Sequence, residues 1–325
     1  MYLSTGLQRV ITVGELLIDF TSLDENKTVK DTSTFEKNAG GAPANVAVAV
    51  ARLGGQAQFV GCVGKDPLGA FLRDAIASYG VDTSYVFTVP EDTTLAFVAR
   101  HDGEPDYYFF RSPGSDTLLS IEHIANVHLD QHSIVHFGSN SLAVDPIKSA
   151  VHAFVKRAKA QQAIVSFDVN LREAFWANVE DALVAAQDMA RQADILKVNT
   201  SELHWLTGEH DVDQALTAIS SMTDAVVLCT LGASGAAVVK KGEQPLYVSG
   251  FPAKVVDATG AGDTFAGALL YQLSRDGVLR ADLALLSGET WTTYVRFATA
   301  AAAINVTQKG AMAAMPSLSQ VQSLL

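Results

Sequence analysis

Short apolar runs alternate with amphipathic stretches along most of the chain, and glycine or polar residues separate them. Runs rich in valine, isoleucine and alanine, such as residues 10–13 and 163–168, predict buried strands. Stretches with helical spacing of apolar residues, such as 68–79 and 146–161, predict helices that pack on a sheet. This alternation predicts an α/β fold in which helices cover both faces of a mostly parallel sheet. Further strands are predicted at 58–63, 133–137, 194–198, 225–229, 236–240 and 254–257, and further helices at 43–53, 179–191, 212–221 and 263–274.

Two segments, 17–38 and 93–111, break the alternation because they carry period-two patterns with no helix between them. In the second segment a turn at 101–105, with glycine and proline, separates two strand-like runs, which predicts a β-hairpin. The aromatic run 107–110 has no obvious helix to cover it. We therefore predict a small sheet that projects from the main domain as a lid, and its apolar face needs a ligand or a second subunit.

The 325 residues are 48% hydrophobic and carry a formal net charge of −12, which suits one large α/β domain over 1–325 and not a nucleic-acid binder. Residues 1–8 lack the pattern of a signal peptide, and the longest apolar stretch, 298–306, predicts a buried helix and not a membrane span. Cys62 and Cys229 lie in apolar runs without ligand-spaced partners. They predict two buried free thiols and a reducing, cytoplasmic setting.

The strongest chemical signal is the run Asp257-Ala-Thr-Gly-Ala-Gly-Asp263, which lies between a predicted strand and a predicted helix. Gly260 and Gly262 allow the backbone to approach a ligand closely, and the first N–H groups of a helix bind phosphate or the charge that develops on it. Asp263 has two interpretations, a base that accepts a hydroxyl proton or a cap of the helix, and the turn alone favours neither. The run is neither a Walker A loop nor a dinucleotide fingerprint.

Two motifs in this order, Gly40-Gly-Ala-Pro-Ala-Asn45 with its later glycines Gly54 and Gly64, and residues 257–263, resemble the signatures of the ribokinase-like, or pfkB, sugar kinases. Ala258 stands where the family usually has threonine. The resemblance covers essentially the whole chain. It implies a three-layer α/β/α fold with a mostly parallel central sheet and a small β-sheet lid, ATP as co-substrate with Mg²⁺, and a homodimer formed through the lid.

The resemblance implies that Asp263 is the catalytic base, that the amides of Gly260, Ala261, Gly262 and Asp263 form the anion hole, and that Arg172 adds positive charge. Phe97 and Phe110 of the lid would close over the sugar ring, or pack between the lids of two subunits. Asp168 and Asn170 would orient the sugar, although capping of a turn at a strand end explains these two residues equally well. The implied sugar-binding set is Asp19, Gly40, Gly41, Asn45, Phe97, Phe110, Arg111, Asp168, Asn170, Arg172 and Asp263.

For the nucleotide, the resemblance implies contacts from Asn199, Thr230, Gly232, Gly235, Gly260, Gly262 and Asn305. Asn199 and Glu202 resemble the family's N-x-x-E motif, which implies that they hold Mg²⁺, partly through water. Taken alone, they predict a capping box at a helix start. The resemblance also implies a K⁺ site formed by Asp257, Thr259 and Gly310. Thr299 stands where an asparagine is common in the family.

Several segments, among them 41–45, 94–97, 110–116 and 167–172, resemble the fructokinase branch in particular. The implied reaction transfers the γ-phosphate of ATP to D-fructose and gives fructose 6-phosphate. The alternatives within the family are a 2-keto-3-deoxygluconate kinase, a ribokinase and a nucleoside kinase. The alternative from another class is a non-catalytic sugar-binding regulator, which loss of Asp263 or of a glycine in its turn would indicate.

Overall fold

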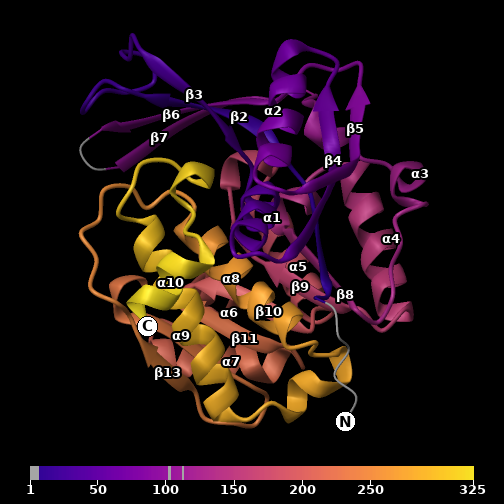
Figure 1. The fold of residues 1–325 in the computed structure, drawn as a ribbon, viewed down its shortest axis with the longest axis vertical. Coiled ribbons are helices and arrows are strands. Elements are labelled where there is room, and N and C mark those ends of the chain that lie inside the picture. The colour runs from indigo at the N-terminus through magenta and orange to yellow at the C-terminus, as the bar shows by residue number, and fades with distance from the viewer. Residues whose placement is uncertain (1–6, 102–103, 112) are drawn as a thin grey trace.

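The computed structural model describes residues 7–101, 104–111 and 113–325, and Figure 1 shows how their elements are arranged. Nine strands of these residues form the central sheet: β1 (Arg9–Val13), β4 (Gln56–Gly64), β5 (Asp82–Val89), β8 (Ser133–Gly138), β9 (Ile164–Asp168), β10 (Ile195–Asn199), β11 (Val226–Thr230), β12 (Gly235–Val239) and β13 (Leu246–Ser249). Their order is β13-β12-β11-β10-β9-β8-β1-β4-β5, and all neighbours are parallel except at the β11–β12–β13 edge. The predicted, mostly parallel sheet is confirmed.

Helices cover both faces of this sheet and create two hydrophobic cores. The first core is formed with α1 (Ala42–Arg52), α2 (Pro67–Ser78), α8 (Ala261–Arg275), α9 (Gly288–Asn305) and α10 (Leu318–Leu324). The second is formed with α3 (Ile121–Ile124), α4 (Ile147–Ala160), α5 (Val179–Ala190), α6 (Thr200–Thr207) and α7 (Val212–Met222). Side chains of β1 alternate between them, since Val10 joins the first core and Ile11 the second. The three-layer α/β/α architecture is confirmed.

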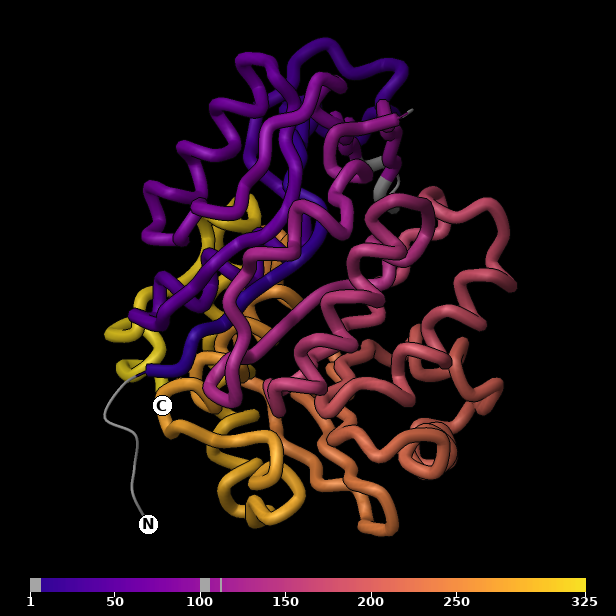
Figure 2. Tube along the Cα trace, turned by 90° about the vertical axis from the view of Figure 1, so that its right-hand side faces the viewer, coloured from indigo at the N-terminus to yellow at the C-terminus, as the bar shows by residue number. Residues whose placement is uncertain are grey.

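Short 3₁₀ segments connect several of these elements: η1 (Ser115–Leu118), η2 (Ser139–Leu142), η3 (Glu173–Phe175), η4 (Gly232–Ser234), η5 (Arg280–Leu285) and η6 (Met312–Ala314). Figure 2, turned by 90°, shows most of the indigo-to-purple segments in the upper half of the molecule and most of the orange segments in the lower half. The yellow C-terminal part packs beside the indigo segment, where α1 contacts α8 and η6.

A second, four-stranded sheet forms the predicted lid and projects from the main body (Figure 1). It comprises β2 (Leu17–Ser22), β3 (Phe35–Gly40), β6 (Leu95–His101) and β7 (Glu104–Phe110), in the order β3-β2-β6-β7. The predicted hairpin is confirmed as β6–β7, but its turn is tighter than expected because Pro105 already pairs with Arg100 in the ladder. An edge strand such as β7 tolerates proline. Residues 102 and 103 of the predicted turn lie outside the described residues.

Two predictions beside the glycine-rich turn are wrong. Residues 254–257 form no strand; Val256 and Asp257 instead donate their N–H groups to the carbonyl of Val306, which follows α9. The apolar side chains that suggested a strand are exposed, Val255 by 63% and Val256 by 52%, and are not core residues. The helix predicted from residue 263 begins earlier, at Ala261, so Asp263 lies inside its first turn.

The predicted state of both cysteines is confirmed. Cys62 and Cys229 are free and buried, and burial raises the pKa of each thiol to about 12. Among the described residues, no helix combines the length and apolar character that crossing a membrane requires. The segment 1–8, from which we predicted the lack of a signal peptide, lies mostly outside the described residues, which begin at residue 7.

Candidate active site

The glycine-rich turn presents free backbone donors at the start of α8. Gly260 precedes the helix with a left-handed φ of 78°, and the first helical hydrogen bond runs from Thr264 N–H to the Gly260 carbonyl (2.8 Å). The amide of Ala261 donates to Ala258 (3.2 Å), so this member of the predicted anion hole is already engaged. Among the described residues, no backbone carbonyl accepts from the N–H groups of Gly262 and Asp263. These donors, at the positive end of α8, suit an anion.

The carboxylate of Asp263 is directed at another helix and does not cap its own. The cap position is Gly260, which has no side chain, and Asp263 Oδ2 accepts a hydrogen bond from Asn45 Nδ2 of α1 at 2.8 Å. The capping interpretation of Asp263 is therefore wrong. This contact also joins the two sequence signatures, because Asn45 belongs to the first signature, the diglycine motif that begins at Gly40 and Gly41.

The surroundings of Asp263 change its acidity. Burial raises the pKa of Asp263 to about 6, although the hydrogen bond from Asn45 and the positive charges of Lys197 and Arg172 oppose the rise. The nearby charge of Asp168 adds to it. A carboxylate with this pKa is ionised at neutral pH and is a stronger base than an ordinary aspartate, as general base catalysis requires.

Asp19 of β2 and the loop with Gly40 and Gly41 lie close to this carboxylate. Burial raises the pKa of Asp19 to about 7, the charge of Arg172 opposes the rise and that of Asp263 adds to it. Gly40 lies directly against Asp19, since a Cβ at residue 40 would stand 2.0 Å from Asp19 Oδ2. Gly41 has a φ of 109°, a conformation that favours glycine. The predicted residues of β2 and α1 therefore come together with Asp263.

The aromatic residue on the lid face of Asp19 differs from those predicted. In the paired strands, Asp19 lies opposite Ala96, and Ala96 lies opposite Phe109, so these three residues share one face of the lid. Phe97 pairs with Phe20 and Tyr108 on the other face, where its ring stacks on Phe20 at 5.0 Å.

Phe110 lies on the same outer face, opposite Leu95, and is 56% exposed. The expectation that Phe97 and Phe110 close over the sugar therefore does not fit the strand register. A shift of one residue reverses which face a side chain occupies. Phe109 is the aromatic residue on the face of Asp19.

The two arginines predicted to contact the sugar are placed differently. Arg111 is 7% exposed, donates to Asp116 Oδ2 through Nε (2.9 Å) and Nη2 (2.6 Å), and lies 4.2 Å over the ring of Phe175. These contacts of the Arg111 guanidinium with Asp116 and Phe175 anchor the lid to the main body. Arg172 is exposed, and its one hydrogen bond to a described residue goes to the Leu171 carbonyl (3.2 Å). Its charge acts on the carboxylates of both Asp19 and Asp263.

Asp168, predicted to orient the sugar, forms a buried ion pair. Lys197 Nζ donates to both of its oxygens, at 3.0 and 2.7 Å, and both side chains are less than 10% exposed. Asn170, at the end of the same strand, has a left-handed φ of 32°, which asparagine tolerates. Lys197 was missed in the sequence, although a lysine inside the apolar run Ile195-Leu-Lys-Val198 is an unusual residue for a central strand.

Asn199 and Glu202 form the reciprocal capping box at the start of α6. Asn199 Oδ1 accepts from Glu202 N–H (2.9 Å), and Glu202 Oε2 accepts from Asn199 N–H (2.8 Å). Glu202 Oε1 accepts from Leu171 N–H (3.0 Å). Within the described part of the chain, no three His, Cys, Asp or Glu side chains are grouped to hold a metal ion. Because each oxygen of Glu202 already accepts a bond, the site fits a hydrated Mg²⁺ contacted through water.

The residues of the implied K⁺ site are adjacent. Asp257 Oδ1 accepts from the N–H (3.0 Å) and hydroxyl (2.7 Å) of Thr259, and Asp257 Oδ2 accepts from Gly310 N–H (2.9 Å). These bonds fasten the glycine-rich turn to the segment after α9.

An apolar cavity of about 290 Å³ lies on the other side of the glycine-rich turn. Gly262 and Thr299 line it, and the hydroxyl of Thr299 donates a hydrogen bond to the Val295 carbonyl (2.7 Å). Asn305 lies behind this surface: it is buried, and its amide donates to the Ala311 carbonyl (3.3 Å). Of the predicted nucleotide contacts, Thr230, Gly232, Gly235 and Gly262 line the cavity.

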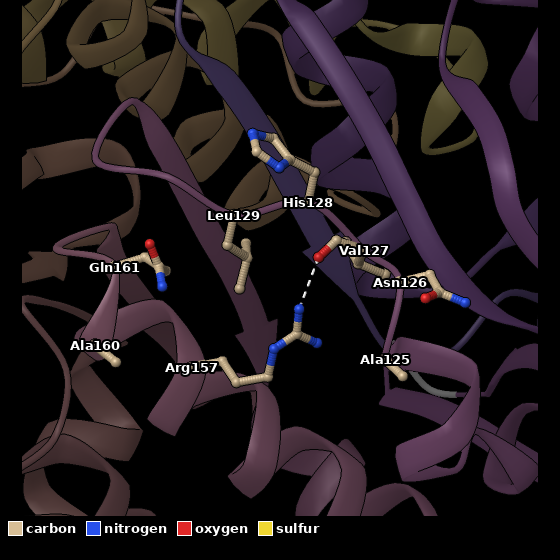
Figure 3. A pocket seen from close by; sticks show the side chains of 8 residues that line it. All are labelled: Ala125, Asn126, Val127, His128, Leu129, Arg157, Ala160 and Gln161. Atoms are coloured by element: carbon tan, nitrogen blue, oxygen red, sulfur yellow. Dashed lines mark hydrogen bonds between the residues drawn. The ribbon is translucent and has the colours of Figure 1, made fainter.

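A second cavity, of about 370 Å³, lies beside α3 and α4 (Figure 3). Arg157 of α4 donates to the carbonyls of Ile124 (2.6 Å) and Val127 (2.8 Å). The cavity precedes β8 and so lies at the amino-terminal ends of the strands, whereas Asp168 and Asn199 lie at carboxyl ends. The guanidinium of Arg157, which lines this cavity, is hydrogen-bonded to backbone carbonyls, and this indicates a structural role.

An open helix N-terminus, with the carboxylates of Asp19 and Asp263 near it and an apolar cavity beside it, is typical of a class of protein: an α/β enzyme that transfers an anionic group to a small polar acceptor. The chain belongs to the pfkB family of carbohydrate kinases, whose family model matches residues 7–318.

It is 36% identical to fructokinase-1 of Zea mays over 99% of both chains. Among solved structures, it is similar to the ATP-bound fructokinase of Xylella fastidiosa (TM-score 0.87, 35% identity, 97% of both chains). It is also similar to the Vibrio cholerae O395 fructokinase bound to fructose, ADP and calcium (TM-score 0.87, 32% identity, 98% of this chain and 99% of that one). The chain is thus a fructokinase-like sugar kinase.

Proposed function

We propose that this enzyme transfers the γ-phosphate of ATP to the 6-hydroxyl of D-fructose and releases ADP and fructose 6-phosphate. Fructose is proposed because the relatives reported above are fructokinases and one of them binds fructose and ADP. The observation that carries the proposal is the contact of Asp263 with Asn45, which brings a carboxylate with raised pKa to the junction of pocket and turn.

In the proposed mechanism, the sugar O6 attacks the γ-phosphorus, and Asp263 accepts the proton of the 6-hydroxyl. The bond from that phosphorus to the β–γ bridging oxygen breaks, and ADP leaves. The free N–H groups of Gly262 and Asp263 stabilise the charge on the transferring group. Arg172, exposed near both carboxylates, supplies positive charge from the other side of the pocket. Most of the catalysis is positioning and electrostatics.

Asp19 would accept hydrogen bonds from sugar hydroxyls next to the diglycine loop, and Phe109 would cover the ring when the lid closes. Glu202 and Asn199 would contact Mg²⁺ through water, and the bound ion would neutralise negative charge on the phosphates of the nucleotide. Asp257, Thr259 and the Gly310 backbone are proposed to hold a K⁺ ion behind the turn.

We further propose a homodimer through the outer face of the lid, where Tyr108 and Phe110 are each 56% exposed. The two buried thiols suit a reducing compartment, and we propose the cytoplasm.

The test is ADP release measured with a panel of fructose, mannose, glucose, ribose, 2-keto-3-deoxygluconate and a nucleoside. The expected result is the highest kcat/KM with fructose and a product phosphorylated at O6. A higher kcat/KM for another member of the panel would replace fructose as the substrate. Absence of sugar-dependent ADP release with every member would favour a non-catalytic sugar-binding protein.

A further inference from the structure

Lys197 is a charged residue in the middle of the central sheet that the proposed mechanism leaves unused. It lies on β10, between the parallel neighbours β9 and β11. Its side chain is 9% exposed, and its ammonium group donates to both oxygens of Asp168, at 3.0 and 2.7 Å. Burial of an ion pair costs desolvation energy, and apolar residues of similar volume are often as stable. Stability alone is therefore a weak explanation for a lysine here.

The ammonium group lies directly against the anion-binding turn. A Cβ placed on Gly262 would stand 3.1 Å from Lys197 Nζ and 3.7 Å from its Cε. Gly262 is also one of the residues whose N–H remains open at the start of α8. A residue with a side chain at 262 would push against the ammonium, so glycine here also keeps the lysine next to the turn.

Three carboxylates surround this cation. Asp168 is hydrogen-bonded to Lys197. Burial raises the pKa values of Glu202 and Asp263, and the positive charge of Lys197 opposes the rise at both carboxylates. Phosphates of a nucleotide would add more negative charge to the same place. Unless a fixed cation compensates them, these negative charges repel one another strongly in a buried site.

We propose that Lys197 is a positioning residue of phosphoryl transfer: its ammonium group, locked by Asp168 behind Gly262, supplies fixed positive charge at the back of the anion hole. This inference rests on the proposed function, because it concerns the same phosphoryl transfer. Asp168 holds the cation in place, which gives that aspartate a role other than sugar binding. The charge is present before the substrate arrives, so little reorganisation is needed when charge develops on the transferring group.

The test compares Lys197→Met with the double variant Lys197→Met/Asp168→Asn. The single variant leaves a buried aspartate unpaired and so can lose folding stability. The double variant removes both charges of the pair and keeps similar shapes, so it removes the cation without leaving a buried aspartate unpaired. Lys240→Met is the matched control, because Lys240 is a partly buried lysine (18% exposed) paired with Glu243 at the far end of β12.

With ATP and fructose, we expect the double variant to lose about 10²-fold in kcat, the size of effect seen when one preorganised donor is removed from an anion hole. Its KM for fructose should stay close to that of the wild type, since Asp19 and Gly40 are intact. Inhibition by ADP with aluminium fluoride, which imitates the transferring phosphoryl group, should weaken by a similar factor, whereas ADP alone should bind as before.

Recovery of the double variant to within a few-fold of wild-type kcat, or unchanged inhibition by the fluoride complex, would overturn the proposal and leave a structural ion pair. Each variant is compared with the wild type on the sugar that the wild type turns over fastest. Failure of the wild type on every sugar would count against the proposed function, whereas the ratio of variant to wild type reports on Lys197 alone.

Discussion

Replacement of Asp263 by asparagine should abolish catalysis and stabilise the protein at the same time. In the wild type, Asn45 Nδ2 donates to Asp263 Oδ2 at 2.8 Å. Asparagine at residue 263 keeps the shape and an oxygen that accepts this bond, but it cannot accept a hydroxyl proton. Removal of a positioned general base typically costs 10²–10⁴-fold, and we expect a loss of kcat of about this size. The coupled assay for ADP release with fructose measures it, and the KM for fructose should change little.

The stabilisation follows from the raised pKa. A shift from 3.8 to about 6 corresponds to about 3 kcal/mol of unfavourable free energy for the ionised carboxylate in the folded state. Because the residue is only partly buried, solvent screening reduces this figure, and we expect a gain of about 1–2 kcal/mol in the free energy of unfolding. Thermal unfolding of the ligand-free variant should therefore occur a few degrees higher at pH 8.

The sign of the pH dependence is a separate check. The folded pKa lies above the unfolded one, so the penalty is fully present above pH 6 and disappears as the pH falls towards 4. The gain of the Asp263→Asn variant over the wild type should shrink in the same window. Asp224→Asn is the control: its aspartate is exposed, so we expect no gain in the free energy of unfolding. Near-normal turnover of Asp263→Asn would refute the base, and an unfolding temperature equal to the wild type at pH 8 would refute the burial argument.

Three further predictions concern the same site. The kcat/KM of the wild type should fall below pH 6–7, because Asp263 and Asp19, with pKa values of about 6 and 7, must both be ionised; a flat profile down to pH 5 would contradict this. Gly40→Ala should raise the KM for fructose about 10–100-fold and leave that for ATP unchanged, because the new Cβ would displace the Asp19 carboxylate that is proposed to bind the sugar hydroxyls. Asp257→Ala should remove stimulation by KCl, because it deletes the acceptor for Gly310; a wild type equally active in potassium-free buffer would refute the K⁺ site.

Most of the fold followed from local patterns. Apolar periodicity predicted the alternating strands and helices and the lid hairpin, because burial on both faces of a parallel sheet requires continuous apolar strands. The prediction of a strand at 254–257 was wrong because the same apolar character also lines a binding cavity. Only the structure distinguishes the two uses, since Val255 lies at the cavity and not in either core.

The chemistry of the glycine-rich turn was also readable from the chain, because glycines, helix start and carboxylate are neighbours in sequence. Its local signal left Asp263 between cap and base. The contact that argues against the cap is with Asn45, 218 residues away, and no local pattern predicts which distant side chain will be packed opposite.

Tertiary structure alone also decided which side chains face the site. Strand register places Phe109 and not Phe97 on the face of Asp19, and register depends on how the two segments of the lid pair. Lys197 takes both oxygens of Asp168 because β9 and β10 are neighbours in the sheet. The sequence by itself thus determined the elements, the turn and the class of chemistry, which depend on neighbouring residues. The partners of each charge were decided by packing between distant segments.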